Sequence, residues 1–522
     1  MRKVRTLLHL VESHKMVFLL LWLLFHRVPT HAQREADNWY FGQQTGFSFR
    51  AGSPPTPIMD GKLSTIYACA TASDPTTGQL LFYSNAEQIW NRAHQLMPNG
   101  DALRGTNFTT QGALIVPMPG DEQRYYLFTL RQRVRGNGSI NDPKDSKLFY
   151  SVVDMRLAGG QGDVAAASKN TPLDGLLTEK LTAVRHTNGR DYWVLAHEWG
   201  SNAFLVYAVT AQGVAAARRQ NIGPAHPAIP ADTALPAGME GQLQASPDGR
   251  KLASAVAFGR AREPFCLFDF DAGTGTLSNF TDLGLLRDGF GVCFSPDNTR
   301  LYVQNFNRTP DQKSLNIISQ YDLTAGNGAA IAASGQSIIA DNPNTNISAM
   351  EGGSSFYTLQ NGPDGRIYGG SGYRGPGTPA GDTGLQTFHV IGKPNARGFA
   401  CEVRFKRFDF DNRPATGGLP NFMQHTFNGL QPAPDPNSSC NLSSVQLFPN
   451  PSAGQLQLQL PEGCTQTYAV SLFDSIGQLV ATYTTGGESG RPPLNISTLA
   501  AGLYVVEVRT GRQKATSKLI KL

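Results

Sequence analysis

A short turn followed by a strand recurs along most of this chain, and this repeat restricts the fold more than any other feature. Its clearest form is the tetrapeptide Ser-Pro-Asp-Gly or a close variant of it. Clear and looser copies begin at Thr76, Gly120, Thr187, Ser246, Ser295 and Gly362. Proline fixes φ at one turn position, Asp-Gly supplies the positive φ of a hairpin turn, and β-forming residues follow. Each copy therefore predicts a tight turn that leads into a strand.

The interval between copies predicts how the strands assemble. Copies lie about 45 to 65 residues apart, as expected for four-stranded propeller blades with variable loops. A second element, seen at Val152, Phe268 and Tyr321, closes a strand. Blades bury both faces only by stacking around an axis. We predict an all-β fold with a β-propeller over residues 38–430, with seven blades favoured over six and the regions near Trp39 and Phe422 closing the ring. A β-sandwich array is the alternative, against which the regular interval argues.

Composition supports an all-β chain with more than one folded unit. The 522 residues include 55 Gly and 33 Pro, and only 16% are charged. That charged fraction lies below the usual level of about one quarter, and abundant turn formers fit many short strands. The length exceeds what one hydrophobic core supports. A net charge of +5 without a basic run gives no support for a nucleic acid partner.

The N-terminus has the features of a targeting segment. An apolar run at residues 17–25 is too short to span a bilayer comfortably, and Thr30-His31-Ala32 suits a signal peptidase. The basic residues that precede this run are Arg2, Lys3, Arg5 and Lys15. We predict a signal peptide at residues 1–32, cut between Ala32 and Gln33, and no transmembrane segment in the mature chain. An uncleaved anchor is the alternative.

The repeat stops before the C-terminal region. Residues 431–444 are rich in Pro, Asn and Ser and predict an extended linker. Short alternating strands resume from 445, which predicts a small immunoglobulin-like β-sandwich at 445–522. The chain should therefore contain a propeller, a linker and a separate C-terminal domain.

The C-terminal domain resembles the type A sorting domain of the type IX secretion system. The matching motifs are Phe-Pro-Asn-Pro before a glycine, a central Ile-Gly-Gln, Gly-Leu-Tyr and a basic end. Their signal residues are Pro449, Asn450, Pro451, Gly454, Gly477, Gly502, Tyr504, Lys518 and Lys521. We expect Gly477 and Gly502 at turns and both lysines in an exposed tail. The resemblance implies the secretion translocon and a sorting protease as partners, and passage through the periplasm to the outer-membrane cell surface or the medium.

The main body resembles secreted Bacteroidetes β-propellers of the WD40-like or YVTN type. The segments that carry this resemblance begin at Asn38, Gln88, Thr110, Leu181 and Gly418. The resemblance implies a fold and a cellular address, but no reaction, because propellers host many activities.

Motifs for catalysis are absent from the sequence. It contains no sialidase Asp-box, Gly-x-Ser-x-Gly elbow, phosphate loop, His-Glu-x-x-His helix or EF-hand. Its most suggestive polar group comprises His186, Asp191, Trp193, His197, Glu198 and Trp199. Consecutive strand residues point to opposite faces, so His197 and Glu198 should not share a metal, and a hydrogen-bonded histidine is expected. We therefore predict no catalytic residue, no metal and no cofactor.

Other chemically notable residues have structural interpretations. Asp248, Asp297 and Asp364 should form turns. Met239, Glu240 and Glu351 begin segments near the predicted channel, without features of an acid–base pair. The six cysteines form no Cys-x-x-Cys motif, so a zinc site is not expected. Cys266 and Cys293 should be buried, while Cys440 and Cys464 could pair in an exported protein.

Three functional hypotheses fit these observations. The first is a non-catalytic surface module that binds protein, glycan or another envelope component through loops at one propeller face. The second is a glycoside hydrolase or lyase with unidentified carboxylates, and the third is a structural part of the envelope or the gliding machinery. Paired acids converging in the channel would favour the enzyme, whereas aromatic and amide groups would favour binding.

Overall fold

Strands are the predominant regular structure of the computed structural model. Within the described residues, helical structure is limited to α2 (Leu157–Gly160), α3 (Gly328–Ala333) and the single turns η2 (Ala166–Ser168), η4 (Gly398–Cys401) and η5 (Gln424–Phe427). The structure describes residues 34–49, 54–131, 147–226, 240–256, 265–284, 289–308, 314–338, 358–370, 387–415, 417–432, 445–459, 467–486, 493–510 and 513–522. The predicted signal peptide, with Ala32 and Gln33, lies outside these residues, as does almost all of the predicted linker.

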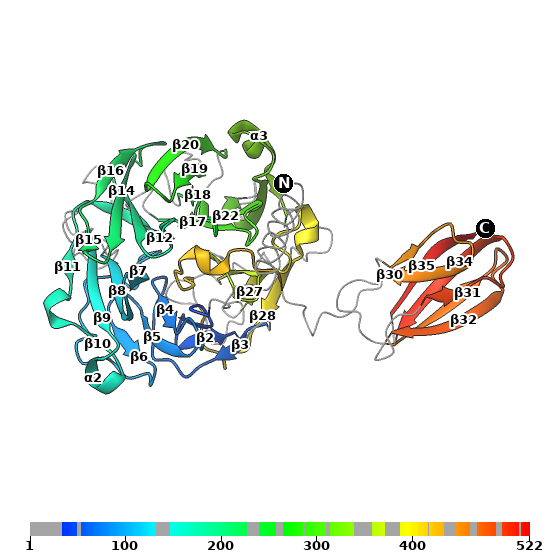
Figure 1. The fold of residues 1–522 in the computed structure, drawn as a ribbon, viewed down its shortest axis with the longest axis horizontal. Helices are drawn as coiled ribbons and strands as arrows, with labels where there is room; N and C mark the ends of the chain where they lie inside the picture. The colour runs from blue at the N-terminus through cyan, green and yellow to red at the C-terminus, as the bar shows by residue number, and fades with distance from the viewer. Residues whose placement is uncertain are drawn as a thin grey trace, which may run out of the picture. The chain divides into compact units, whose positions relative to one another are not determined.

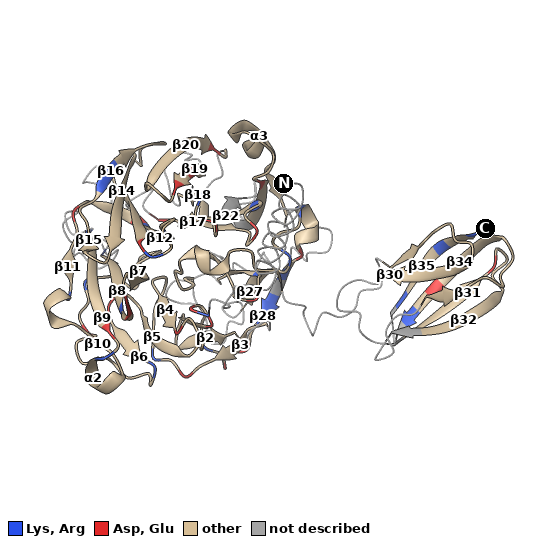
Figure 2. Cartoon of the chain, in the orientation of Figure 1, with Lys and Arg blue, Asp and Glu red and all other residues tan. Residues whose placement is uncertain are grey.

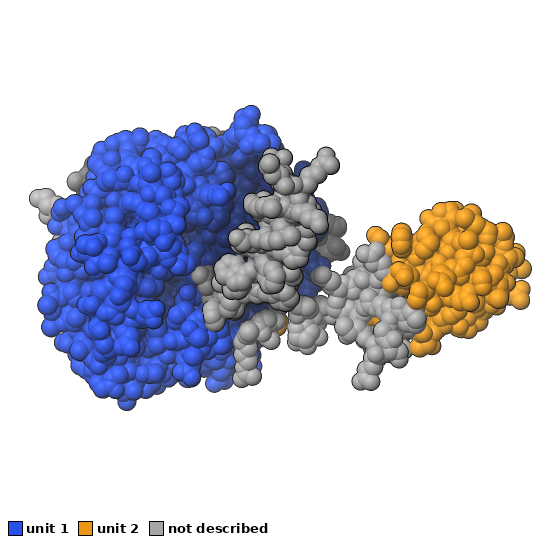
Figure 3. Space-filling model, in the orientation of Figure 1, with its two compact units in different colours: residues 1–51, 55–432 blue, residues 52–54, 433–522 orange. Residues whose placement is uncertain are grey.

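The chain divides into two compact units, coloured blue and orange in Figure 3. The first comprises residues 1–51 and 55–432, and the second comprises residues 52–54 and 433–522. Each unit has its own hydrophobic core. Among the described residues, we find no helix with the length and apolar character needed to cross a bilayer.

Seven sheets follow one another along the described part of the first unit (Figure 1). The first sheet contains β1 (Asn38–Phe41), β2 (Thr45–Ser48) and β3 (Thr56–Ile58). The second contains β4 (Ala70–Ser73), β5 (Leu80–Ser84) and β6 (Ile89–Asn91). The third contains β7 (Ala113–Met118), β8 (Asp121–Arg131), β9 (Lys147–Asp154), β10 (Asp163–Val164) and β11 (Thr171–Pro172). The fourth contains β12 (Leu177–Arg185), β13 (Tyr192–Glu198), β14 (Ala203–Thr210), β15 (Gly213–Val214) and β16 (Arg218–Asn221).

The last three sheets have four strands each. The fifth sheet contains β17 (Leu243–Ala245), β18 (Lys251–Ser254), β19 (Cys266–Asp271) and β20 (Thr276–Asp282). The sixth contains β21 (Gly289–Phe294), β22 (Arg300–Arg308), β23 (Ser314–Asp322) and β24 (Gln336–Ser337). The seventh contains β25 (Leu359–Asn361), β26 (Ile367–Gly369), β27 (Thr387–Ile391) and β28 (Val403–Arg407). The first strands β1, β4, β7, β12, β17, β21 and β25 contact one another in this order. The predicted β-propeller is confirmed. The seven sheets favour seven blades, but the blade number remains a prediction.

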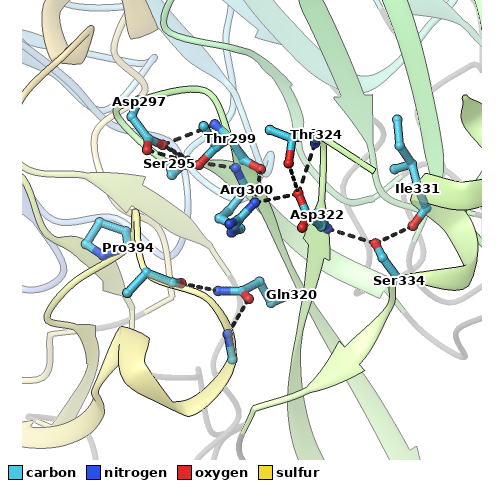
Figure 4. Close-up of polar contacts among 12 residues, drawn as sticks. Ser295, Asp297, Thr299, Arg300, Gln320, Asp322, Thr324, Ile331, Ser334 and Pro394 are labelled. Atoms are coloured by element: carbon cyan, nitrogen blue, oxygen red, sulfur yellow. Dashed lines mark hydrogen bonds and ion pairs between the residues drawn. The ribbon is translucent and has the colours of Figure 1, made fainter. Parts of the chain in front are cut away.

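The repeated turns have the geometry that their sequence predicts. All six copies join the first strand of a sheet to its second strand. In the copy shown in Figure 4, Ser295 Oγ donates to Asp297 Oδ1 at 2.6 Å and accepts the Arg300 N–H at 2.9 Å. Asn298 supplies the positive φ, +64°, where other copies have glycine. Hydrogen bonds within five residues of the chain therefore stabilise the turn.

An aromatic core closes the ring between the first and last sheets. Trp39 in β1 is fully buried, and its ring centroid lies 5.8 Å from both Tyr368 and Phe422. Phe47 in β2 lies 4.6 Å from Phe408, which follows β28. The expected closure near Trp39 and Phe422 is thus found, and it relies on packed rings instead of a sheet shared by the two ends.

The second unit is a two-sheet sandwich. One sheet contains β29 (Gln446–Phe448), β30 (Gln455–Gln459) and β33 (Leu494–Asn495), and the other contains β31 (Thr467–Phe473), β32 (Leu479–Gly486), β34 (Gly502–Thr510) and β35 (Gln513–Lys521). Alternate residues of these strands, such as Val470, Val506 and Leu519, form its core. The predicted immunoglobulin-like sandwich is confirmed.

Replacing Trp39 by Ala should destabilise the propeller by about 3–5 kcal/mol, because a large buried ring would be lost from the closing core. Urea unfolding of the purified chain would measure this change. Phe280→Ala is a matched control, since Phe280 is 39% exposed and its loss should change the free energy of unfolding by less than about 1 kcal/mol. Equal effects of both substitutions would contradict a closing role for Trp39.

Candidate functional site

The two faces of the propeller differ in their connections. The repeated turns, with the short turns between third and fourth strands, form one face, which we call the turn face. In the six sheets from β4 onward, connections from second to third strands and from one sheet to the next form the opposite face, the loop face. By this definition its longest connections are residues 92–112, 132–146, 222–242, 338–358 and 370–386, and all but the first lie largely outside the described residues. Long loops on a rigid scaffold are where binding groups concentrate, so the loop face is the candidate binding face.

Residues 417–432, which we call the channel segment, run through the centre of the ring. Near the loop face, the Gly418 N–H donates to Ile66 O at 3.1 Å, just before β4 begins. Near the turn face, the Gly429 N–H donates to Pro296 O at 2.7 Å, just after β21 ends. The one-turn helix η5 between them is the gold ribbon at the middle of the ring in Figure 1. The segment therefore spans the channel from one face to the other.

Amide side chains join the channel segment to the inner strands. Asn421 Nδ2 donates to Leu181 O at 3.0 Å and to Ala113 O at 3.3 Å. Gln111 adds a second link, because its Oε1 accepts the N–H groups of Leu181 at 3.2 Å and Leu243 at 2.8 Å. These bonds connect β7, β12 and β17.

A second glutamine has the same function on the other side of the ring. Gln242 Oε1 accepts the N–H groups of Val292 at 3.2 Å and Leu359 at 2.9 Å, which joins β21 and β25. Gln424 of the channel segment accepts from Asn361 Nδ2 at 3.2 Å. The amide groups anticipated for a binding propeller are therefore present, but they hold the ring together.

Aromatic and charged residues surround the loop-face end of the channel. The Tyr67 ring lies 5.5 Å from that of Phe108 and 5.7 Å from that of Phe290. A β-bulge between Leu177 and Leu181 places Glu179 and Lys180 in this region, and both are buried.

Both charged residues tie β12 to neighbouring parts of the ring. Glu179 Oε2 accepts the Thr110 N–H at 2.6 Å, and Lys180 Nζ donates to Glu240 O at 3.1 Å. Glu240 thus lies near the channel, as expected from the sequence, while Met239 and Glu351 lie outside the described residues.

The structure separates the polar group that the sequence singled out. His186 and Asp191 lie in the turn between β12 and β13, where the His186 ring stacks on Trp193 at 5.4 Å. Glu198, at the other end of β13, forms an ion pair with Arg219 at 2.6 Å. The residues of this group therefore do not form one site.

His197 and Glu198 differ in surroundings as the strand geometry predicts. The His197 ring is buried and stacks on His226 at 4.0 Å, whereas Glu198 pairs with Arg219 and Ser201. Within the described residues, Nδ1 of His197 has no hydrogen-bond partner. The hydrogen-bonded histidine expected from the sequence is therefore not found at that atom. Trp199 is also buried.

Two of the three turn aspartates have the expected local role. Asp248 accepts from Ser246 Oγ at 2.6 Å, as Asp297 does from Ser295. Asp364 differs because glycine replaces the serine of its turn. It accepts instead from Arg366 and from Tyr368, both at 2.7 Å, and its side chain is almost fully buried. All three serve the fold.

The described cysteines are buried and do not form disulfides. These residues are Cys69, Cys266, Cys293 and Cys401. Burial raises the pKa of the Cys401 thiol to about 12, which keeps it in the unreactive thiol form. Cys440 and Cys464, which could pair, lie outside the described residues.

The sorting-signal residues form a framework at one end of the sandwich. Asn450 Nδ2 donates to Lys518 O at 2.7 Å, and its Oδ1 accepts the Ile520 N–H at 2.9 Å. The peptide bonds before Pro449 and Pro451 are both cis. The motif at the start of this domain is thus bonded directly to the last strand.

The remaining signal residues stabilise turns and strand ends. Gly477 has a φ of +84° in a turn whose Asp474 carboxylate accepts two N–H groups, as expected for a turn glycine. Gly454 O accepts the Ile496 N–H at 2.8 Å, and Tyr504 Oη donates to Ala500 O at 2.9 Å. Gly502 begins β34, opposite Lys521.

The expected exposed basic tail is only half correct. Lys518 is exposed, but Lys521 is 7% exposed. Alternation along β35 turns residue 521 toward the inside, on the same side as the core residue Leu519. The prediction of an exposed Lys521 is therefore wrong.

Comparison with known families identifies the C-terminal domain. Residues 446–522 match the secretion system C-terminal sorting domain. This domain belongs to the type IX secretion system, so the chain is exported to the cell surface or secreted. Among curated proteins, no sequence matches this chain.

Solved structures with similar folds are distant in sequence. A protein provisionally described as a 6-phosphogluconolactonase from Bacteroides uniformis is 12% identical, with 73% of this chain and 98% of that chain covered and a TM-score of 0.42. A GH74 enzyme from Niastella koreensis is 10% identical, with 94% and 72% covered and a TM-score of 0.39. Likenesses at this level carry no information about activity, and the propeller assignment rests on the sheets themselves.

Replacing Asn421 by Leu should destabilise the propeller by about 1–3 kcal/mol, because two strand carbonyls in the channel would lose their donor. Urea unfolding would measure this loss. Gln95→Leu is the control, since the Gln95 side chain is exposed and its loss should have little effect. A channel segment without a structural role would give equal values for the two variants.

Acid should destabilise the propeller through His197. Burial, reinforced by the Lys180 ammonium, lowers the pKa of His197 to about 3 from the ordinary 6.5. Below pH 6.5 the unfolded chain binds a proton at His197 that the folded chain excludes. The contribution of neutral, buried His197 to the free energy of unfolding is therefore complete above pH 6.5 and is lost as the pH falls toward 3. It amounts to about 1.4 kcal/mol per pH unit in that window. Unfolding free energies measured from pH 7.5 to 4 should have a shallower slope for His197→Gln, and an unchanged slope would contradict this assignment.

Proposed function

We propose that this chain is a surface-delivered binding protein whose propeller captures an envelope protein or glycan through the loop face without catalysis. The main support is the channel segment, which occupies the centre of the ring from the loop face to the turn face. Propeller glycosidases need two carboxylates converging in a central funnel. Here strand-linking amides and backbone occupy that position.

The positions of the chain ends also favour recognition at the loop face. At the start of the described chain, the Arg34 N–H donates to Pro75 O in the turn between β4 and β5. At the end of the propeller, Gln431 Oε1 accepts from Asn395 Nδ2 at 3.4 Å, beside the turns of the last sheet. Both ends of the unit thus lie at the turn face. Neither of these ends therefore occupies the loop face.

Charge on the described chain gives no reason to expect a strongly charged ligand. Lysine and arginine are interspersed with aspartate and glutamate and do not form a stripe of one sign (Figure 2). Binding would then depend on loop hydrogen bonds and aromatic contacts, which suits a neutral glycan or a protein surface.

Shortening the loop-face connections tests this proposal. Replacement of residues 341–355 or 229–238 by short Gly-Ser linkers should weaken binding of the purified chain to isolated cell envelopes at least tenfold. A pelleting assay with purified polysaccharide or envelope protein fractions would distinguish the two ligand classes. The control replaces α2, which joins β9 to β10 at the turn face, by a linker of equal length.

Turnover would contradict the non-catalytic assignment. Incubation of the chain with envelope polysaccharides should release neither new reducing ends nor unsaturated sugar products, as measured by colorimetric assay and mass spectrometry. Release of products that is lost in the loop variants would establish a hydrolase or lyase instead. Equal binding by the α2 variant and both loop variants would locate the ligand elsewhere.

A further inference from the structure

One end of the sorting domain exposes apolar side chains on the outer face of the sheet formed by β32, β31, β34 and β35. On β34 and β35, Leu503 is 49% exposed and Ile520, directly opposite, is 48% exposed. With neighbouring exposed residues they form what we call the apolar end, which comprises Leu479, Leu503, Val505, Ile520 and Leu522. A contiguous apolar surface of this kind marks an interaction site more often than it serves the fold.

The rest of this sheet face is polar. The next cross-strand row contains Ser471, Thr482, Glu507 and Thr516. Beyond it, Arg509 and Lys514 pair with Glu507 at 3.0 and 3.5 Å. The core of the sandwich uses the opposite side of the same strands. The apolar end is therefore a local feature that the hydrophobic core does not require.

The sorting-signal residues position the apolar end. Asn450 holds the backbone on both sides of Leu519 through Lys518 O and the Ile520 N–H. Ser452 continues this link, since its N–H donates to Ile520 O at 2.9 Å and its carbonyl accepts the Leu522 N–H at 3.0 Å. The turn of Gly477 leads into Leu479. Asn450 and the turn of Gly477 thus form hydrogen bonds within the domain, while the side chains of Leu479, Ile520 and Leu522 beside them face solvent.

Lys518 adds one charge to this surface. It stands opposite Val505 on the same exposed face, next to Ile520. Among the described residues, no carboxylate pairs with Lys518, in contrast to Lys514 on the same strand. An apolar surface with one free cation complements a partner groove that is apolar and carries a carboxylate at its rim.

We propose that the apolar end with Lys518 is the surface through which a protein of the export machinery binds this domain. The family match identifies a domain that is recognised for export but assigns no surface to that recognition. In this arrangement Lys518 is the signal residue that makes a contact, together with Leu503, Val505 and Ile520, and the other signal residues are positioning residues. The inference is independent of the loop-face function proposed above.

The test uses the full chain expressed in a bacterium with type IX secretion. Leu503→Ser combined with Ile520→Ser should lower the amount at the cell surface at least tenfold, with accumulation in the periplasm. Lys518→Glu should reduce delivery in the same direction. The matched controls are Leu157→Ser, an exposed leucine of the propeller, and Lys514→Glu on the polar part of β35, and both should be delivered normally.

Folding and self-association are measured on the same variants. The thermal transitions of the purified full chain should remain unchanged, because the substituted side chains are exposed. Normal surface delivery of the double variant and of Lys518→Glu would overturn the proposal. So would a defect in Lys514→Glu equal to that of Lys518→Glu. Sedimentation that shows a dimer in the wild type and a monomer in the double variant would assign the surface to a second copy instead.

If the double variant melts at a lower temperature, Lys518→Glu decides the outcome, because it removes no apolar contact from the fold. The export and ligand-binding results remain distinguishable. Loop-face variants should be exported normally and lose binding, whereas apolar-end variants should stay in the periplasm and bind normally once purified.

Discussion

The need to pair backbone groups in the channel is the constraint on which the propeller depends. Its inner strands end around a narrow space, where a buried carbonyl or N–H without a partner is costly. Gln111, Gln242 and Asn421 meet this need by hydrogen bonding to strands of neighbouring sheets. The same amides link neighbouring sheets and hold the channel segment in place. The links between sheets and the path of the channel segment thus depend on the same side chains.

Ring closure depends on residues that are far apart in the sequence. Phe41 and Phe47 in the first sheet pack on Phe388 and Phe410 near the end of the propeller. Arg413 then donates to Met59 O at 2.9 Å before the chain enters the channel. Because such contacts close very long loops, the ring should form late in folding.

Local features were predictable from the sequence, and long-range ones were not. The Ser-Pro-Asp-Gly turns fold through bonds within about five residues, so all six copies were located correctly. The alternating strands after residue 445 also predicted the sandwich. Nothing local marks residues 417–432 as the occupant of the channel, because their partners come from five different sheets. Lys521 was misjudged since chain-end position predicts exposure, whereas strand alternation turned it inward.

The route of the channel segment also gives the propeller mechanical properties. The chain leaves at the turn face only after passing the inner strands, so tension on residues beyond 432 acts first on the middle of the ring. Such a pull loads the hydrogen bonds that join Asn421, Gln424 and Gly429 to different sheets before it can separate β28 from the edge of the last sheet. A propeller tethered through this end would therefore transmit shear force through the channel segment to several sheets at once.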